Sequence, residues 1–229
     1  AGADAGGDQE EAAAVPGPEW IRFLTSHPKS FPPALARTMA ATPKICRQLH
    51  LPLQSGSASV LERMKRGYTR KDYLETAAAL RALMPSIRLS ADIIVGYPGE
   101  TEAEFKETLS ALAEIRFAGI FSFCYSPRPR TAAARLTDDV PAEIKKRRLM
   151  EVQALQKDIQ LAFHKTLIGG RERVLCTGRS KKDPAVFAGR NEGNQVVNFR
   201  SNADVVGRFV EVEITDAGPY SLRGIAVAG

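Results

Sequence analysis

The first half of the chain alternates between two hydrophobic periods. Between residues 20 and 126, short β-branched runs are followed by stretches with apolar residues every three or four positions. This pattern predicts strands at residues 21–25, 48–54, 89–95 and 120–125, and helices at 33–41, 58–66, 70–83 and 101–116. Repeated strand–helix units predict parallel strands joined by right-handed crossovers.

The pattern changes twice in the second half. A long helix is expected from 141 to 167, with Asp138 or Asp139 as its cap and the basic run 145–148 mostly outside its buried stripe. After Gly169 and Gly170 the helical spacing ends. Short alternating runs then predict five strands, at 173–177, 186–188, 195–199, 209–215 and 221–227. Five short strands in so few residues predict a small closed or nearly closed barrel.

The composition is that of a soluble globular protein, and the charge is uneven. The 229 residues carry a net charge of +6 and are 44% hydrophobic. Residues 141–190 hold 12 Lys and Arg against 5 Asp and Glu, so this segment carries the whole basic excess. A local excess beside a small β domain favours a polyanionic partner over a merely solvated surface.

Three predicted strands end in loops of unusual composition, at residues 51–57, 96–100 and 125–131. Loops that follow parallel strands lie at one edge of a sheet, where ligands bind in α/β proteins. The Ser-Gly-Ser turn offers hydroxyl groups, and Gly96 and Gly99 allow close approach of the backbone to a flat ring. Each loop alone reads as an ordinary turn, but together they predict a ligand site.

The cysteines and histidines do not form a metal site by themselves. The three cysteines are odd in number and widely spaced, which argues against a disulfide framework and for a reducing compartment. No two cysteines have a ligand spacing, and neither do the three histidines. The sequence therefore predicts that nothing in this chain holds a metal by itself.

Several long motifs carry a specific resemblance. Residues 25–28, 50–57, 64–69, 92–101 and 125–129 resemble the radical S-adenosylmethionine methylthiotransferases, and residues 189–199 and 221–224 resemble the TRAM domain at the end of that family. Arg128, Pro129 and residues 189–194 are similar to the branch that acts on transfer RNA. Arg130 and Ala91 depart from the family pattern, which usually has Gly and Thr there.

The resemblance implies an α/β fold: half of a radical-SAM (βα) barrel, then a five-stranded, OB-like TRAM barrel. The domains expected are a disordered leader or insert at 1–19, the C-terminal half-barrel with its connecting helix at 20–168, and an RNA-binding barrel at 169–229. The implied reaction is methylthiolation of C2 of N6-isopentenyladenosine beside the anticodon. It uses S-adenosylmethionine, two four-iron four-sulfur clusters and an electron donor. Since the cluster-binding cysteines are not in this sequence, the chain is expected to be inactive alone.

Roles are carried over residue by residue. The cofactor is expected to be bordered by residues of the second and third strand ends: Gln54, Ser55, Ser57, Ile94, Gly96, Pro98 and Glu100. Tyr125 and Arg128 are expected on the substrate side. Phosphates of the RNA are expected to contact loops of the barrel, at Arg179, Lys181, Lys182, Arg190 and Asn191.

Two other interpretations remain open at this stage. The chain could be a non-catalytic RNA-binding isoform, or it could belong to the branch that modifies a ribosomal protein. The partner expected from the resemblance is tRNA, with no membrane contact and a monomeric state. The expected location is soluble and intracellular: the cytoplasm, or a mitochondrion or plastid if a transit peptide precedes the sequence.

Overall fold

A computed structural model describes residues 11, 13–22, 24, 27–127 and 135–227. Most of the leader expected at 1–19 (residues 1–10 and 12) lies outside the described residues, as do Arg128, Arg130 and part of the strand expected at 21–25. Glu11, Ala13 and Ala14 have helical backbone. Among the described residues, no helix combines the length and apolar character that crossing a bilayer requires.

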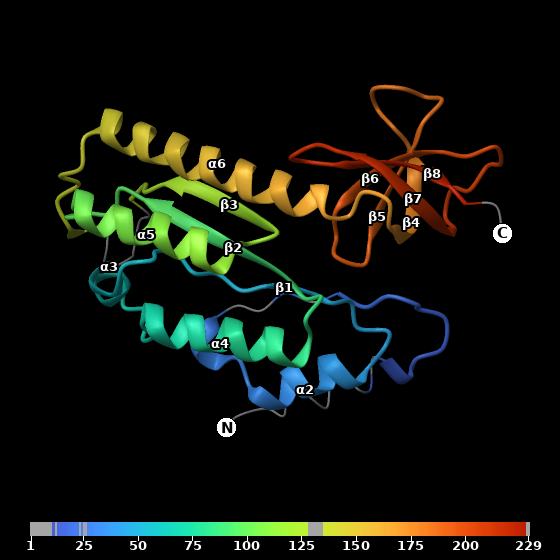
Figure 1. The fold of residues 1–229 in the computed structure, drawn as a ribbon. Coiled ribbons are helices and arrows are strands. Elements are labelled where there is room, and N and C mark those ends of the chain that lie inside the picture. Colours follow the sequence, from blue (N-terminus) through green and yellow to red (C-terminus); the bar gives the residue numbers. More distant parts are fainter. Residues whose placement is uncertain (1–10, 12, 23, 25–26, 128–134, 228–229) are drawn as a thin grey trace.

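The first part of the fold is a parallel sheet with strand order β1-β2-β3 (Figure 1). The strands are β1 (Gln48–His50), β2 (Arg88–Val95) and β3 (Gly119–Cys124). The strand expected at 21–25 appears as two isolated parallel bridges, Ile21 with Ile45 and Leu24 with His50. The strand expected at 48–54 is shorter than predicted because Pro52 has no N–H to donate, although the Leu51 N–H still bonds to Ser90 O.

Helices cover one face of this sheet (Figure 1). They are α2 (Pro33–Ala41), α3 (Ala58–Arg63), α4 (Arg70–Leu83) and α5 (Glu102–Ile115), preceded by the short 3-10 helix η1 (Pro28–Ser30). Along β2, Leu89, Ala91, Ile93 and Val95 are buried toward the helices. The intervening Ser90, Asp92 and Ile94 are only partly buried, and Phe121 and Phe123 of β3 are 60% and 53% exposed. One face of the sheet is therefore open.

Capping boxes fix the starts of two of these helices. Thr101 accepts from the Glu104 N–H and Glu104 accepts from the Thr101 N–H, as the Thr-x-x-Glu spacing predicts. Thr69 and Asp72 form the same arrangement at α4. The helix boundaries were therefore encoded locally, and α4 begins and ends where the sequence pattern placed it.

The long helix α6 (Ala142–Lys165) runs beside β3 toward the second part of the fold (Figure 1). Two expectations about it were wrong. Its N-cap is Pro141 without a side-chain hydrogen bond, since Asp138 instead pairs with Lys145. The basic run is also not mostly exposed: Lys145 and Arg148 are 7% and 4% exposed because both form ion pairs under the helix.

The second part is a closed barrel with strand order β4-β5-β6-β8-β7. Its strands are β4 (Arg171–Arg179), β5 (Phe187–Asn191), β6 (Val196–Arg200), β7 (Phe209–Ala217) and β8 (Leu222–Ala226). A separate core fills it, including Val174, Phe187, Phe199 and Ile214. Gly189 is required for closure, because a Cβ there would lie 2.3 Å from Leu175 O of the neighbouring strand.

The barrel lies at the amino-terminal end of the sheet strands and is fastened there (Figure 1). The Arg22 guanidinium donates to Asn191 O at 2.7 Å, and the Arg47 N–H donates to the Glu192 carboxylate at 2.9 Å. On α6, His164 Nδ1 lies 2.7 Å from Gly218 O. These contacts involve the turn after β5, the loop after β7 and two distant parts of the sheet domain, so the two domains are joined at several points.

Candidate functional site

The loops that follow β1, β2 and β3 meet at one edge of the sheet. Gln54 pairs with Ile93 near the end of β2, and the Tyr125 N–H donates to Val95 O at 2.8 Å. The rings of Tyr97 and Tyr125 lie edge to face with their centroids 5.2 Å apart. The predicted cofactor and substrate loops therefore lie side by side at the carboxyl end of the strands.

The loop between β2 and α5 is held by a buried carboxylate. Gly96 and Gly99 have φ of 70° and 74°, which favours glycine at both positions. The Glu100 carboxylate accepts from the Gly96 N–H at 2.6 Å and from Arg148 at 2.8 Å. Burial raises the pKa of Glu100, and the bonds from Gly96 and Arg148 act in the opposite direction. In this structure Glu100 shapes the loop from within the protein.

The side chain of Lys145, on α6, packs against the loop between β2 and α5. A Cβ on Gly96 would lie 2.3 Å from Lys145 Cγ, so the aliphatic part of this side chain occupies the space beside the glycine. The Lys145 ammonium pairs with Asp138 at 2.5 Å and lies 5.4 Å from the centre of the Tyr125 ring. The close approach that Gly96 allows is therefore made here by a lysine of α6.

The Ser55-Gly56-Ser57 turn packs against α5. Ser55 Oγ lies 3.2 Å from Thr108 Oγ1, which also accepts from the Gly56 N–H at 3.0 Å. Ser57 Oγ lies 3.0 Å from Ser59 Oγ. Ser55 and Ser57 have no exposed surface. Their hydroxyl groups bond within the protein, and their predicted contact with a cofactor stays a prediction.

The remaining predicted residues at this edge differ in accessibility. Ile94 and Tyr125 are partly exposed, whereas Gln54 and Pro98 are buried. Gln54 has a left-handed backbone with φ of 70°, which marks a constrained turn at the strand end. Of the predicted residues, Ile94 and Tyr125 thus offer surface to a ligand at the carboxyl edge, together with the exposed Phe123 of β3.

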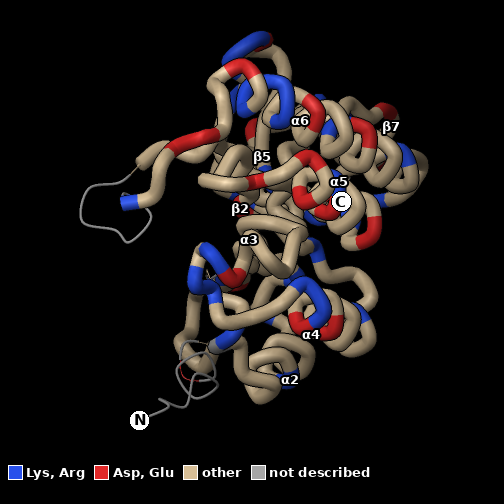
Figure 2. Tube along the Cα trace, turned by 90° about the vertical axis from the view of Figure 1, so that its left-hand side faces the viewer, with Lys and Arg blue, Asp and Glu red and all other residues tan. Residues whose placement is uncertain are grey.

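The basic segment is only partly free for a polyanion. Arg147 pairs with Glu102 at 2.7 Å and with Glu151 at 2.6 Å. Figure 2 views the sheet from its carboxyl end and shows basic positions of α6 beside acidic positions of α5. Much of the excess charge on α6 is therefore matched by acids from other parts of the chain.

The five predicted RNA contacts in the barrel differ in exposure. Arg179 is exposed at the end of β4, Lys181 and Lys182 are exposed in the loop that follows, and Arg190 is exposed on β5. Asn191 is 1% exposed. Its amide donates to Glu172 at 2.9 Å and to Gln195 at 2.8 Å, and its oxygen accepts from the Gln195 N–H. The Asn191 side chain is thus directed into the turn between β5 and β6, away from solvent.

The cysteines do not form a ligand set. Cys46 and Cys176 are buried and Cys124 is partly exposed, and each is a free thiol. Burial raises the pKa of Cys46 to about 11, which keeps the thiol protonated at neutral pH. Within the described part of the chain, no three His, Cys, Asp or Glu side chains are grouped as metal ligands would be. The described thiols do not fit an iron–sulfur cluster, which requires thiolates.

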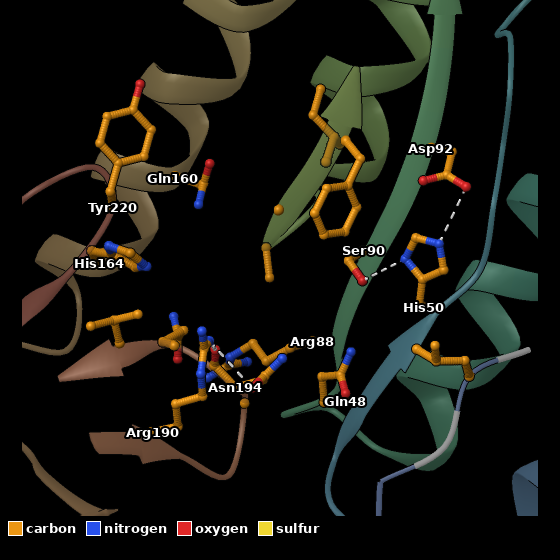
Figure 3. Close-up of a pocket in the computed structure, with 18 residues that line it drawn as sticks. Gln48, His50, Arg88, Ser90, Asp92, Gln160, His164, Arg190, Asn194 and Tyr220 are labelled. Carbon is orange, nitrogen blue, oxygen red and sulfur yellow. Dashed lines mark hydrogen bonds and ion pairs between the residues drawn. The ribbon is translucent and has the colours of Figure 1, made fainter. Parts of the chain in front are cut away.

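Sequence reasoning missed a pocket of about 480 Å³ between the open face of the sheet and the barrel (Figure 3). His50 lies at its sheet side, with Nδ1 3.1 Å from Ser90 Oγ and Nε2 3.5 Å from Asp92. The alternation of Ser90 and Asp92 with buried apolar residues marks them as facing away from the helices. The barrel wall that closes the pocket comes from residues more than 60 positions away, and no local pattern indicates it.

Comparison with known proteins agrees with this architecture. Residues 3–112 match the Radical SAM superfamily, and residues 165–227 match the TRAM domain. The chain is 50% identical over 214 residues to a tRNA-2-methylthio-N(6)-dimethylallyladenosine synthase of Geobacter metallireducens, covering 93% of this chain and 48% of the relative. Proteins of the same name from Hahella chejuensis and an Acidovorax species are 49% and 46% identical over 215 and 220 residues. These alignments cover 93% and 96% of this chain and 48% and 49% of the two relatives.

The chain spans about half the length of the curated relatives it matches. Within that span the resemblance in sequence extends through both the parallel sheet and the closed barrel. By these matches the chain contains a Radical SAM segment followed by a TRAM domain, and it is similar to about half the length of proteins named tRNA-2-methylthio-N(6)-dimethylallyladenosine synthase.

Proposed function

We propose that this chain forms part of a tRNA methylthiotransferase that acts on C2 of N6-isopentenyladenosine beside the anticodon. One observation carries the proposal. The same sheet domain holds three strand-end loops together at its carboxyl edge and is hydrogen-bonded to the TRAM barrel at its other end. The names of the relatives supply the substrate class.

The residues at the carboxyl edge would hold S-adenosylmethionine on the open face of the sheet. Ile94 provides accessible apolar surface there beside Phe123 of β3, and Tyr125 follows at the end of β3, where its N–H donates to Val95 O. Gly96 and Glu100 would act indirectly, by fixing the loop on which that surface depends. When bound, the cofactor supplies a radical for hydrogen abstraction and a methyl group. The chain's own residues position it and keep water away.

Iron–sulfur clusters belong to radical SAM chemistry in general. The three thiols of this chain do not fit such a cluster. The proposal is that cluster ligands come from sequence beyond these residues, together with an electron donor. We further propose a monomer in a soluble compartment, the cytoplasm or an organelle.

The exposed cations of the barrel would hold the RNA. Arg179 at the end of β4 and Lys181 and Lys182 in the loop after it lie close together in sequence, and their positive charges would neutralise phosphates. The burial of Asn191 instead supports a structural role in the neighbouring turn.

Nucleoside analysis of total tRNA from a strain lacking the gene tests the proposed reaction. Loss of the 2-methylthio derivative with accumulation of N6-isopentenyladenosine supports it. An unchanged nucleoside profile overturns it in favour of the RNA-binding alternative, and loss of a methylthio group from a ribosomal protein would indicate the sister branch.

A further inference from the structure

The pocket between the sheet and the barrel lies away from the proposed cofactor edge. Its lining includes the first residues of all three strands, among them Gln48, Arg88 and Gly119. The cofactor edge lies at the opposite, carboxyl end of the same strands. A volume of about 480 Å³ is within the range of small-molecule sites. The pocket is therefore a separate place for a ligand.

Two deeply buried side chains in this pocket have polar atoms without a partner. His164 is 2% exposed, and its Nε2 has no hydrogen bond within the described structure. Since Nδ1 faces the carbonyl of Gly218, Nδ1 carries a proton and donates it to that carbonyl. Gln195 is 8% exposed, and its Nε2 is an unused donor. Both atoms have almost no solvent-accessible surface, so they lie behind the pocket wall and make no contact with a ligand in the pocket.

Two guanidinium groups line the same space. Arg88 is packed on the Phe163 ring at 4.3 Å and touches the turn that contains Gly193. Burial lowers the pKa of Arg88, while Glu172 and Glu192 act to raise it. Arg190 donates to Asn194 O at 2.7 Å and remains exposed. Figure 3 shows Arg88 and Arg190 near each other at one end of the pocket. This end offers several N–H donors to an anionic oxygen.

The other walls fit the rest of a nucleotide. Phe121 and Tyr220 line the pocket and are 60% and 70% exposed, so each presents aromatic surface on which a base can stack. Across the pocket from the arginines, Asp92 is held by His50 and accepts hydrogen bonds only. Ribose hydroxyl groups are donors of the kind that such a carboxylate accepts.

We propose that this pocket binds a nucleotide, with the phosphate at Arg88 and Arg190, the sugar toward Asp92, and the base against the aromatic side chains. This site goes beyond the proposed methylthiotransferase function and does not require it. The nucleotide is either a free mononucleotide or one residue of a single-stranded RNA.

Isothermal titration of the full chain with adenosine and uridine monophosphates tests the first source, and titration with a six-nucleotide single-stranded RNA tests the second. Inorganic phosphate and adenosine are the comparison ligands. Binding of a mononucleotide or the RNA, at least about tenfold tighter than each comparison ligand, is expected, since charge-assisted hydrogen bonds and stacking are both needed.

Variants locate the binding in the pocket. Arg190→Gln should weaken nucleotide binding at least about tenfold, and Tyr220→Ala at least about fivefold. Both side chains are exposed, so neither substitution threatens folding. Arg208→Gln removes an equally exposed cation of the barrel outside the pocket and should leave the affinity within twofold.

Three results would overturn the proposal. Inorganic phosphate binding as tightly as the nucleotides would mean that no base is recognised. Adenosine binding as tightly would mean that no phosphate is recognised. Equal effects of Arg190→Gln and Arg208→Gln would place the binding on the general charge of the barrel. The proposed methylthiotransferase function is tested separately, by the nucleoside analysis of tRNA from the deletion strain, so the two proposals can fail independently.

Discussion

Arg148 of α6 donates to the carboxylate of Glu100 at 2.8 Å, and both side chains are buried at the carboxyl edge of the sheet. Forty-eight positions separate them in sequence. The pair connects the loop after β2 to the helix that leads to the barrel. A change at Arg148 should therefore be felt both in stability and at the cofactor edge.

Replacing Arg148 with Met should lower the free energy of unfolding by about 3–5 kcal/mol, because it leaves the buried Glu100 carboxylate without its partner. Urea unfolding at neutral pH measures this loss. Arg147→Met is the matched control, since Arg147 is exposed and its ion pairs are solvated. Equal losses in the two variants would contradict a special role for the buried pair.

The stability of the chain should depend on Glu104 at acid pH. Hydrogen bonds from Arg63, and further bonds from Ser59 and Thr101, lower the pKa of Glu104 to about 2. In the unfolded state the pKa of Glu104 stays near its ordinary value of 4.5. The unfolded state therefore binds more protons between these two values, and stability falls as the pH falls from about 4.5 to 2.

Glu104→Gln should remove this part of the pH dependence. Thermal unfolding measured at pH 5 and pH 3 would then show a smaller decrease for the variant than for the unmodified chain. Glu62→Gln, an exposed residue of α3, serves as the control. Parallel melting curves for the unmodified chain and Glu104→Gln would rule out the contribution assigned to Glu104.

Gly56→Ala should destabilise the turn after β1. A Cβ at this position would lie 2.6 Å from Glu107 O and from the Thr108 Cα, which are backbone atoms of α5 and cannot move aside easily. Overpacking of this kind costs about 1–3 kcal/mol in the free energy of unfolding. Gly218→Ala provides the comparison, since its Cβ would make only an ordinary contact at 3.5 Å. A neutral Gly56→Ala would show that the turn and α5 are not tightly packed.

Binding of an anticodon stem-loop should weaken with salt and depend on the exposed barrel loop. Removing Lys181 or Lys182 should each reduce the slope of log affinity against log salt by about 0.7–0.9, the value for one phosphate contact. Fluorescence anisotropy between 50 and 200 mM salt, about the range over which such contacts are lost, measures the slope.

Asn191→Ala should behave differently from the lysine variants. Its side chain is buried and bonded to Glu172 and Gln195, so the substitution should lower the melting temperature of the barrel and leave the salt slope unchanged. A reduced slope with unchanged melting would restore Asn191 as a phosphate contact.

The elements with a local cause could be predicted from sequence. Thr101 and Glu104 form the capping box that their spacing predicts, and the alternation in β2 shows which residues face the helices. The five barrel strands followed from their alternating runs, although their ends differ by a few residues. These features depend on neighbours only a few positions away.

The features that sequence reasoning missed depend on distant partners. In the sequence, Lys145 and Arg148 look like part of a solvated basic face. In the structure both are buried, because Lys145 pairs with Asp138 and Arg148 pairs with Glu100. Asn191 sits in a basic, polar segment but is turned inward by Glu172. The pocket at His50 needs the barrel as its second wall. None of these partners has a fixed sequence spacing that would have indicated it.

Fastening the barrel by Arg22, Arg47 and His164 has a consequence for how a long polymer could engage the chain. The exposed cations and the carboxyl edge cannot approach each other freely, because the sheet lies between them at fixed length. An RNA bound by the exposed cations would have to span the length of the sheet to reach the carboxyl edge. That distance would limit which nucleotide can be placed there. A nucleotide would then be selected by its distance from the bound part of the RNA before its base is recognised.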